Sequence, residues 1–160
     1  MVIDADALNI VSLNPSILKA NPNCIVTPHP GEMKRLLAGF GMDALIPAER
    51  ITQASEFAKK TGVVTVLKGN KTVIASVPDG TVSVNSSGSP ALATAGSGDV
   101  LAGIAGTFLA QGFAAEKAAA AAVFIHGLCG EISPFGNRGT IADDLPRLLP
   151  EAMKRISPFA

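Results

Sequence analysis

Short β-branched runs alternate along this chain with longer segments whose apolar residues recur at helical spacing. Val63–Leu67 is the clearest strand candidate, Cys24–Thr27 is a second, and Met1–Asn9 starts as a short apolar strand that leads directly into a turn and a helix. Strands of this apolar kind lie inside parallel sheets, where helices cover both faces. The alternation therefore predicts an α/β fold with a mainly parallel sheet.

The remaining elements follow from apolar spacing and from turn residues. Thr72–Val77 and Thr81–Val84, separated by Pro78-Asp79-Gly80, are typical of a hairpin, which we expect at an antiparallel edge of the sheet. Helical spacing predicts helices over Glu32–Phe40, Pro47–Thr61, Asp99–Gln111, Ala114–Gly127 and Asp143–Ile156, the last interrupted or restarted at Pro146 and Pro150.

Composition excludes several classes of protein. The 160 residues include 13 Lys plus Arg and 13 Asp plus Glu, so the net charge is zero, and 48% of residues are hydrophobic. Such a chain can build a core, and it offers no basic patch for nucleic acid or for an anionic membrane. No apolar run is long enough to cross a membrane. We expect a cytoplasmic protein that binds small molecules, with Cys24 and Cys129 as buried apolar residues.

One carboxylate stands out in a long uncharged stretch. Residues 81 to 115 carry a single charge, Asp99, which follows Gly96, Ser97 and Gly98 at the start of a predicted helix. Glycines let the backbone approach a ligand closely, and the amides at a helix start attract anions. A carboxylate there can act as general base on a hydroxyl while the amides hold a phosphate. The alternative is that Asp99 only caps the helix.

Four segments together resemble a known family. They are Val2–Asn9, Thr27–Glu32, Leu67–Thr72 and Leu92–Gly103. In this order and spacing they resemble the ADP/ATP-dependent NAD(P)H-hydrate dehydratases of the ribokinase-like superfamily. The resemblance implies a three-layer α/β/α fold. It covers nearly the whole chain but only the C-terminal part of the family's domain, so we expect residues 1–160 to form one partial domain without its N-terminal part.

The resemblance implies repair of damaged nicotinamide cofactors. The family phosphorylates the ring hydroxyl of hydrated NADH or NADPH with ADP or ATP and then loses phosphate. By resemblance, Asp99 is the catalytic base, and Gly96, Ser97 and Gly98 form the anion hole. Family members are often multimeric, and the Ala- and Gly-rich helices suit close packing, so we also expect a homo-oligomer.

The remaining site residues come from two other segments. By resemblance, the nucleotide is bound by the loop that follows the Val63–Leu67 strand. This loop consists of Lys68, Gly69, Asn70, Lys71 and Thr72. His29 contacts the hydrated cofactor, and Glu32 orients Mg²⁺ or its water. Asn70-Lys71 replaces the family's common Gly-Ala, and Ala95 stands where a Gly often precedes Gly-Ser-Gly-Asp; both departures leave the choice between ADP and ATP open.

Each of these residues also has a purely structural interpretation. Lys68 and Gly69 could be a strand end with a turn, His29 a surface loop residue, and Glu32 an acid that stabilises the first turn of a helix. His126 is expected to be a packed histidine at a helix end rather than a ligand. Two other functions stay open: a related small-molecule kinase of the hydroxymethylpyrimidine or thiazole type, or a non-catalytic fragment that needs a partner chain.

Overall fold

A single five-stranded sheet organises the chain. The computed structural model describes residues 1–77 and 79–157, so Pro78 of the predicted hairpin turn lies outside the described residues. The strands follow the order β1-β2-β3-β4-β5. The bounds are β1 Val2–Ile3, β2 Ile25–Val26, β3 Val64–Leu67, β4 Val73–Ala75 and β5 Val82–Val84. β1, β2 and β3 are parallel, and β4 and β5 continue the sheet antiparallel, which confirms the predicted hairpin edge.

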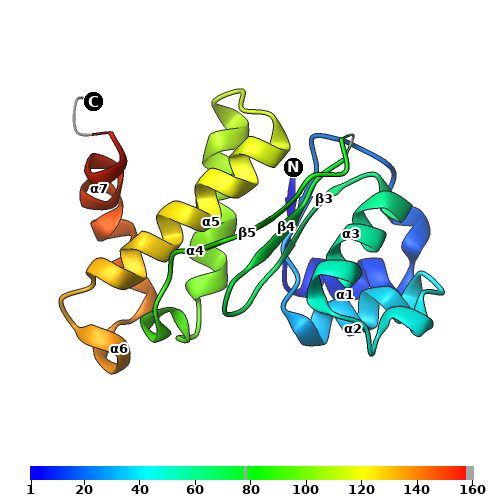
Figure 1. Cartoon of the computed structure of the whole chain (residues 1–160), viewed down its shortest axis with the longest axis horizontal. Coiled ribbons are helices and arrows are strands. Elements are labelled where there is room, and N and C mark those ends of the chain that lie inside the picture. Colours follow the sequence, from blue (N-terminus) through cyan, green and yellow to red (C-terminus); the bar gives the residue numbers. More distant parts are fainter. Residues whose placement is uncertain (78, 158–160) are drawn as a thin grey trace.

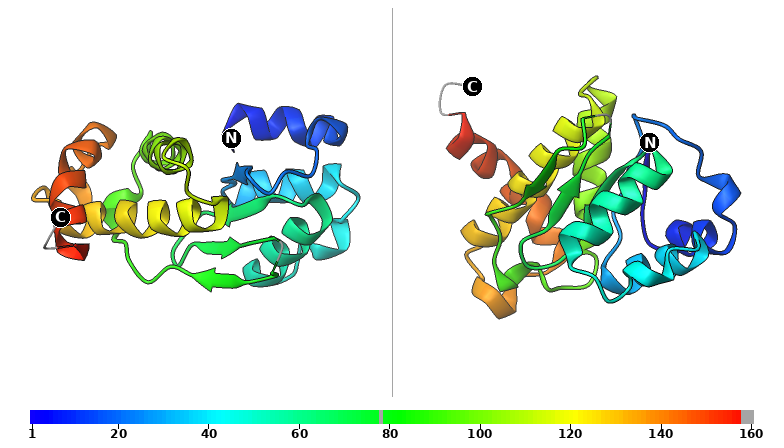
Figure 2. Two further views of the ribbon diagram at one scale, coloured as in Figure 1. Left: turned by 90° about the horizontal axis from the view of Figure 1, so that it is seen from above. Right: turned by 45° about the vertical axis from the view of Figure 1, so that its right-hand side comes forward.

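Helices cover both faces of this sheet (Figures 1 and 2). One layer holds α1 (Asp6–Leu13), α2 (Pro30–Gly39) and α3 (Arg50–Thr61). The opposite layer holds α4 (Ser97–Ala110) and α5 (Ala115–Ile132). Short α6 (Gly136–Gly139) and α7 (Leu145–Ile156) lie toward the far end of α5 (Figure 1). The expected three-layer α/β/α arrangement is therefore confirmed.

Alternating side chains of the strands divide the core in two. Val26 and Leu67 belong to the cluster that α1, α2 and α3 complete, whereas Ile25, Val64 and Val66 belong to the cluster under α4 and α5. All five are at most 1% exposed, and burial of each such side chain contributes about 1.5–3 kcal/mol. α5 meets the sheet through alanines, Ala115, Ala118, Ala119 and Ala122. Their small side chains allow this long helix to lie close to the strands.

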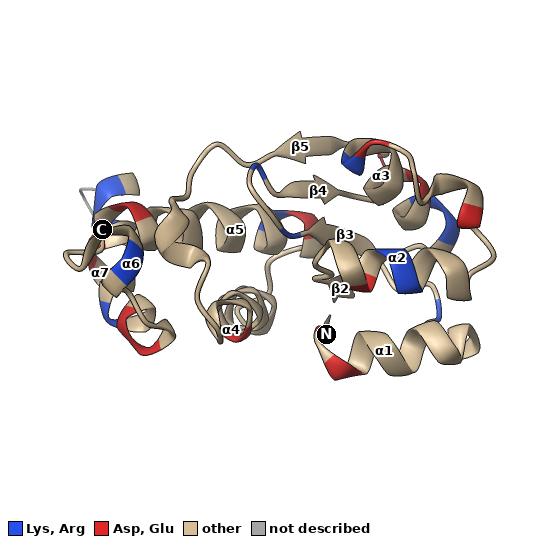
Figure 3. Ribbon diagram, turned by 90° about the horizontal axis from the view of Figure 1, so that it is seen from below, with Lys and Arg blue, Asp and Glu red and all other residues tan. Residues whose placement is uncertain are grey.

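Both cysteines are buried, as expected. Cys24 and Cys129 are fully enclosed and unbonded to each other, and burial raises the pKa of the Cys129 thiol to about 11. Within residues 1–77 and 79–157, no helix has the length and apolar character needed to cross a membrane. Figure 3 shows that α4 is almost free of charge, in agreement with the sequence.

Several details of the helices differ from the sequence prediction, among them the start of α3 at Arg50 rather than at Pro47. α5 continues past Gly127 to Ile132, because Gly127 and Gly130 provide room for Ser87 and Leu92 rather than ending the helix. The short α6 was not predicted. α7 begins beside Pro146 and continues through Pro150 without a break between elements.

The turn after β1 holds a strained residue. Ala5 precedes α1 with φ +50° and ψ −127°, a backbone conformation that favours glycine. The strain lies between Asp4, which reaches the site described below, and Asp6, the first residue of α1. Strained backbone of this kind persists only where surrounding contacts impose it.

We expect Ala5→Gly to stabilise the protein by about 1 kcal/mol, because glycine removes the Cβ clash at positive φ. The free energy of unfolding in urea measures the effect. Ala7→Gly, in the first turn of the same helix, is the matched control and should lower stability by about 0.5 kcal/mol. Equal losses in the two variants would contradict the strain at Ala5.

Candidate functional site

The carboxyl ends of the three parallel strands bring together an ionic cluster. Asp4 follows β1 and Lys68 follows β3, and Nζ of Lys68 lies 2.7 Å from Oδ1 of Asp4. Oε2 of Glu32, from the first turn of α2, lies 3.9 Å from the same ammonium. The Lys68, Asp4 and Glu32 side chains are only 20%, 11% and 6% exposed. Open α/β sheets bind ligands at this edge, outside the carboxyl ends of their strands.

The start of α2 fixes the orientation of His29 and Glu32. Nδ1 of His29 accepts hydrogen bonds from the N–H groups of Gly31 (3.0 Å) and Glu32 (3.2 Å). In return, Oε2 of Glu32 accepts the N–H of His29 at 2.8 Å. Nδ1 is thus an acceptor, so a neutral His29 carries its proton on Nε2, 3.4 Å from Oε1 of Glu32. The ring is half exposed, so His29 is a helix cap that also presents an edge to solvent.

The start of α4 lies against the same cluster. Gly96, with φ +84°, is the N-cap residue, and no side chain caps this helix. The interpretation of Asp99 as a cap is therefore wrong: Asp99 lies in the first turn and is exposed. A Cβ at Gly98 would lie 3.3 Å from Nζ of Lys68 and 3.6 Å from Oδ2 of Asp4. Glycine thus lets the helix start approach the ion pair closely.

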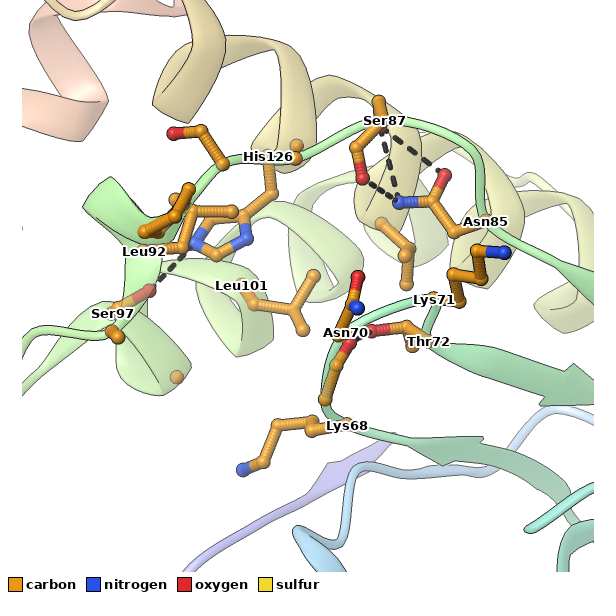
Figure 4. Close-up of a pocket in the computed structure, with 18 of the residues that line it drawn as sticks. Lys68, Asn70, Lys71, Thr72, Asn85, Ser87, Leu92, Ser97, Leu101 and His126 are labelled. Carbon is orange, nitrogen blue, oxygen red and sulfur yellow. Dashed lines mark hydrogen bonds between the residues drawn. The ribbon is translucent and has the colours of Figure 1, made fainter. Parts of the chain in front are cut away.

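A cavity of about 670 Å³ opens between these elements. Figure 4 shows Lys68, Asn70, Lys71 and Thr72 on one side, and Ser97, Leu101 and His126 on the other. Among the predicted site residues, the cavity is lined by His29, Lys68, Gly69, Asn70, Lys71, Thr72, Ser97 and Gly98. Glu32, Gly96 and Asp99 do not line it: Glu32 faces Lys68, and the other two flank Ser97 and Gly98 at the start of α4.

The predicted nucleotide segment forms a tight turn between β3 and β4, which we call the nucleotide loop (Lys68–Thr72). Gly69 and Lys71 both have positive φ, +143° and +55°. The N–H of Lys68 donates to the carbonyl of Pro28 at 2.8 Å, and Oγ1 of Thr72 donates to the carbonyl of Gly69 at 3.0 Å. The loop therefore has a defined shape, held to the end of β2.

His126 is packed, as expected, but it does not lie at a helix end. It lies in the middle of α5, is 7% exposed and lines the cavity. Its Nε2 lies 3.1 Å from Oγ of Ser97, so α5 is linked to the start of α4 (Figure 4). Burial lowers the pKa of His126 to about 4. The signal that could have marked it is an imidazole in the otherwise apolar stretch from Ala118 to Gly130 of this helix.

Metal ligands are sparse around the cavity. In the part of the chain that the structure describes, no group of three or more His, Cys, Asp or Glu side chains could hold a metal ion. Glu32 is buried and already accepts the backbone N–H of His29. These residues fit a Mg²⁺ ion only where phosphates and waters supply most of its ligands, which is the usual arrangement for Mg²⁺.

The sheet, its two helix layers and a cavity at the strand ends define a ribokinase-like α/β protein, as solved relatives also indicate. Residues 1–153 match a family model described as NAD(P)H-hydrate dehydratase, and the chain belongs to this family. The expected family is thus confirmed.

Named relatives agree with the family model. The chain is 41% identical over 158 residues to the bifunctional NAD(P)H-hydrate repair enzyme Nnr of Moorella thermoacetica, covering 97% of this chain and 29% of that protein. It is 44% identical over 135 residues to the ADP-dependent (S)-NAD(P)H-hydrate dehydratase of Neisseria meningitidis, covering 82% of this chain and 45% of that protein.

A crystal structure gives the same result. It is the ADP/ATP-dependent NAD(P)H-hydrate dehydratase of Bacillus subtilis, co-crystallised with ATP and Mg²⁺, and it matches with a TM-score of 0.79 and 32% identity. The match covers 98% of this chain and 56% of the Bacillus chain. The chain therefore spans about half of that solved chain, and less than half of the two curated relatives.

We expect the stability of the protein to depend on His126 between pH 6.5 and 4. The pKa of His126 falls from 6.5 in the unfolded chain to about 4 in the folded chain, so only the unfolded chain binds the proton in this window. The stabilisation from neutral His126 is complete above pH 6.5 and decreases as the pH falls toward 4, by up to about 3 kcal/mol.

Urea unfolding of the wild type and of His126→Gln at several pH values measures this difference. Because carboxylates titrate equally in both proteins, the comparison isolates the imidazole. The stability advantage of the wild type should shrink as the pH falls through this window. Parallel pH profiles for the two proteins would contradict a buried neutral His126.

Proposed function

We propose that the protein repairs hydrated nicotinamide cofactors, by nucleotide-dependent dehydration of hydrated NADH or NADPH. The observation that carries the proposal is the cavity, in which the nucleotide loop and the start of α4 face each other beside His29. Family membership and the names of the relatives support the same reaction. One cavity would then hold a nucleotide against one wall and deliver its terminal phosphate to the other.

The start of α4 suits phosphoryl transfer. In our proposal, the carboxylate of Asp99 accepts the proton of the ring hydroxyl, whose oxygen then attacks the terminal phosphorus of ADP or ATP. The bond from that phosphorus to the leaving nucleotide breaks at the same time. Gly96, Ser97 and Gly98 form the anion hole, since amides at a helix start stabilise negative charge on a phosphate. Among the described residues, the N–H groups of Gly96 and Gly98 have no protein acceptor.

Elimination completes the proposed dehydration. The carbon–oxygen bond of the phosphorylated ring breaks, phosphate leaves with the bonding electrons, and the neighbouring ring carbon loses a proton. The ring double bond of NADH or NADPH is thereby restored. A phosphate is a better leaving group than hydroxide, which is why a nucleotide would be consumed.

The remaining proposed roles are those that the family resemblance implies, and the positions of these residues at the strand ends support them. Lys68, Gly69, Asn70, Lys71 and Thr72 bind the nucleotide, and His29 contacts the hydrated cofactor through the exposed edge of its ring. Mg²⁺ bound with the nucleotide would supply positive charge to the phosphates, and Glu32 would orient it through a water molecule. The Lys68 ammonium, beside Gly98, would add charge where the phosphate is transferred.

Two finer expectations are part of the proposal. We propose that the protein works in the cytoplasm. We also propose that it forms a homo-oligomer, because α4 and α5 are rich in small residues that permit close helix packing. Light scattering after size exclusion measures the oligomeric state. The description of residues 1–160 as one partial domain stays a prediction.

The reaction can be followed by the return of NADH absorbance. We expect the full gene product, mixed with hydrated NADH, Mg²⁺ and ADP or ATP, to restore the absorbance at a rate that depends on the nucleotide. Asp99→Asn should reduce this rate by about 100-fold or more while leaving nucleotide affinity nearly unchanged, because it removes only the proposed base.

The control is Asp43→Asn, which changes an acid in a short turn between α2 and α3, far along the chain from α4. It should keep the wild-type rate. Failure of the wild type with both nucleotides would overturn the proposed function. A stable phosphorylated product without elimination would favour a small-molecule kinase instead.

A further inference from the structure

Arg50, the first residue of α3, is partly buried, and its guanidinium contacts the nucleotide loop. Its Nη2 donates to the carbonyls of Leu67 (2.8 Å) and Lys68 (3.1 Å), and its Nη1 donates to the carbonyl of Asn70 (2.7 Å). Arg50 does not line the cavity, although Lys68 and Asn70 do. The loop therefore lies between this guanidinium and the proposed ligand.

The contact is specific to a guanidinium. Only Arg presents several N–H donors in one rigid plane, so a single side chain can reach three carbonyls. Gly69, with φ +143°, makes room for it: a Cβ there would lie 3.1 Å from Nη2 of Arg50. Nε of Arg50 is buried without a partner, and no ion pair to a carboxylate is found for Arg50 among the described residues. Burial lowers the pKa of Arg50.

The carbonyls that face Arg50 determine the direction of the N–H groups that follow them in the loop. In a trans peptide, the C=O and the following N–H point in opposite directions. The carbonyls of Lys68 and Asn70 face Arg50, so the N–H groups of Gly69 and Lys71 face away from it. Among the described residues, neither N–H has an acceptor, and both residues line the cavity. Lys71 accepts a positive φ in this arrangement.

We infer that Arg50 is a positioning residue for nucleotide binding, because it holds the loop so that the amides of Gly69 and Lys71 point into the cavity as donors. The inference rests on the proposed function for the identity of the ligand, a nucleoside di- or triphosphate. Arg50 itself does not touch the nucleotide. It contributes by ordering the loop before binding, so the complex loses less conformational freedom when it forms.

The test measures ADP and ATP binding to the full gene product by calorimetry. Arg50→Ala should weaken binding roughly tenfold or more, because the loop loses its preorganisation. The nucleotide affinity of Arg50→Lys should lie between those of the wild type and Arg50→Ala, or equal that of Arg50→Ala, since an ammonium keeps the charge but lacks the planar arrangement of donors. Arg155→Ala is the matched control, because Arg155 is an exposed arginine that pairs with Glu151 on α7. This variant should bind nucleotide like the wild type.

Chemical rescue separates positioning from general loss of structure. Guanidinium chloride at millimolar concentration, far below denaturing levels, should restore much of the affinity of Arg50→Ala by filling the vacated space. It should have no such effect on the wild type or on Arg155→Ala. Amide hydrogen exchange should be faster over residues 68–72 of Arg50→Ala before nucleotide is added, and the added guanidinium should slow it.

The outcomes are distinct. Wild-type affinity in Arg50→Ala would overturn the inference, as would a loss of affinity that guanidinium leaves unchanged while circular dichroism shows a folded protein. A wild type that binds nucleotide but dehydrates no hydrated cofactor would overturn the proposed function alone. Binding and hydrogen exchange do not depend on the reaction, so rescue in that protein would still support the role of Arg50.

Discussion

An ion pair between Lys68 and Asp4 joins the ends of β3 and β1, two strands that both flank β2 and do not touch each other in the sheet. The pair is mostly buried, so its attraction is stronger than at a free surface, and either charge left alone would cost several kcal/mol. Glu32 faces the same ammonium from α2. The ammonium is thus shared between carboxylates of two segments, and glycine at residue 98 lets the start of α4 lie close beside it.

The site relies on the backbone for much of its positive potential. The chain has no net charge, and α4 carries one charged side chain, the carboxylate of Asp99. In our proposal, the amides at the start of α4 and in the nucleotide loop are donors to phosphate, and neighbouring side chains hold both segments in place. His126 links α5 to Ser97 on one wall, and Arg50 holds the loop on the other. The imidazole of His126 and the guanidinium of Arg50 thus contact the two segments whose amides we propose as donors to phosphate.

Local sequence patterns predicted the strands well, because strand propensity and turn residues act over a few neighbouring positions. The β-branched run at Val63–Leu67 became β3, and the hairpin segments became β4 and β5. They failed where a distant segment decides. Gly127 was predicted to end a helix, but α5 continues through it. The missing side chain at Gly127 instead gives room to the loop at Ser87, which crosses α5 there. The start of α4 also differs from the prediction, for a local reason: the helix begins at Ser97 rather than Asp99, after Gly96 with positive φ and without a side-chain cap.

The sequence by itself determined the alternation of strands and helices, the family, and the segments that meet at the strand ends, because these depend on residue type, spacing and order. Only the tertiary structure decided which side chains act together. Arg50 and its partners in the nucleotide loop are 18 and 20 residues apart, Ser97 and His126 are 29 apart, and Asp4 and Lys68 are 64 apart. No local pattern encodes such contacts, since they arise only when folding brings distant segments together and most buried polar groups pair with a neighbour in space.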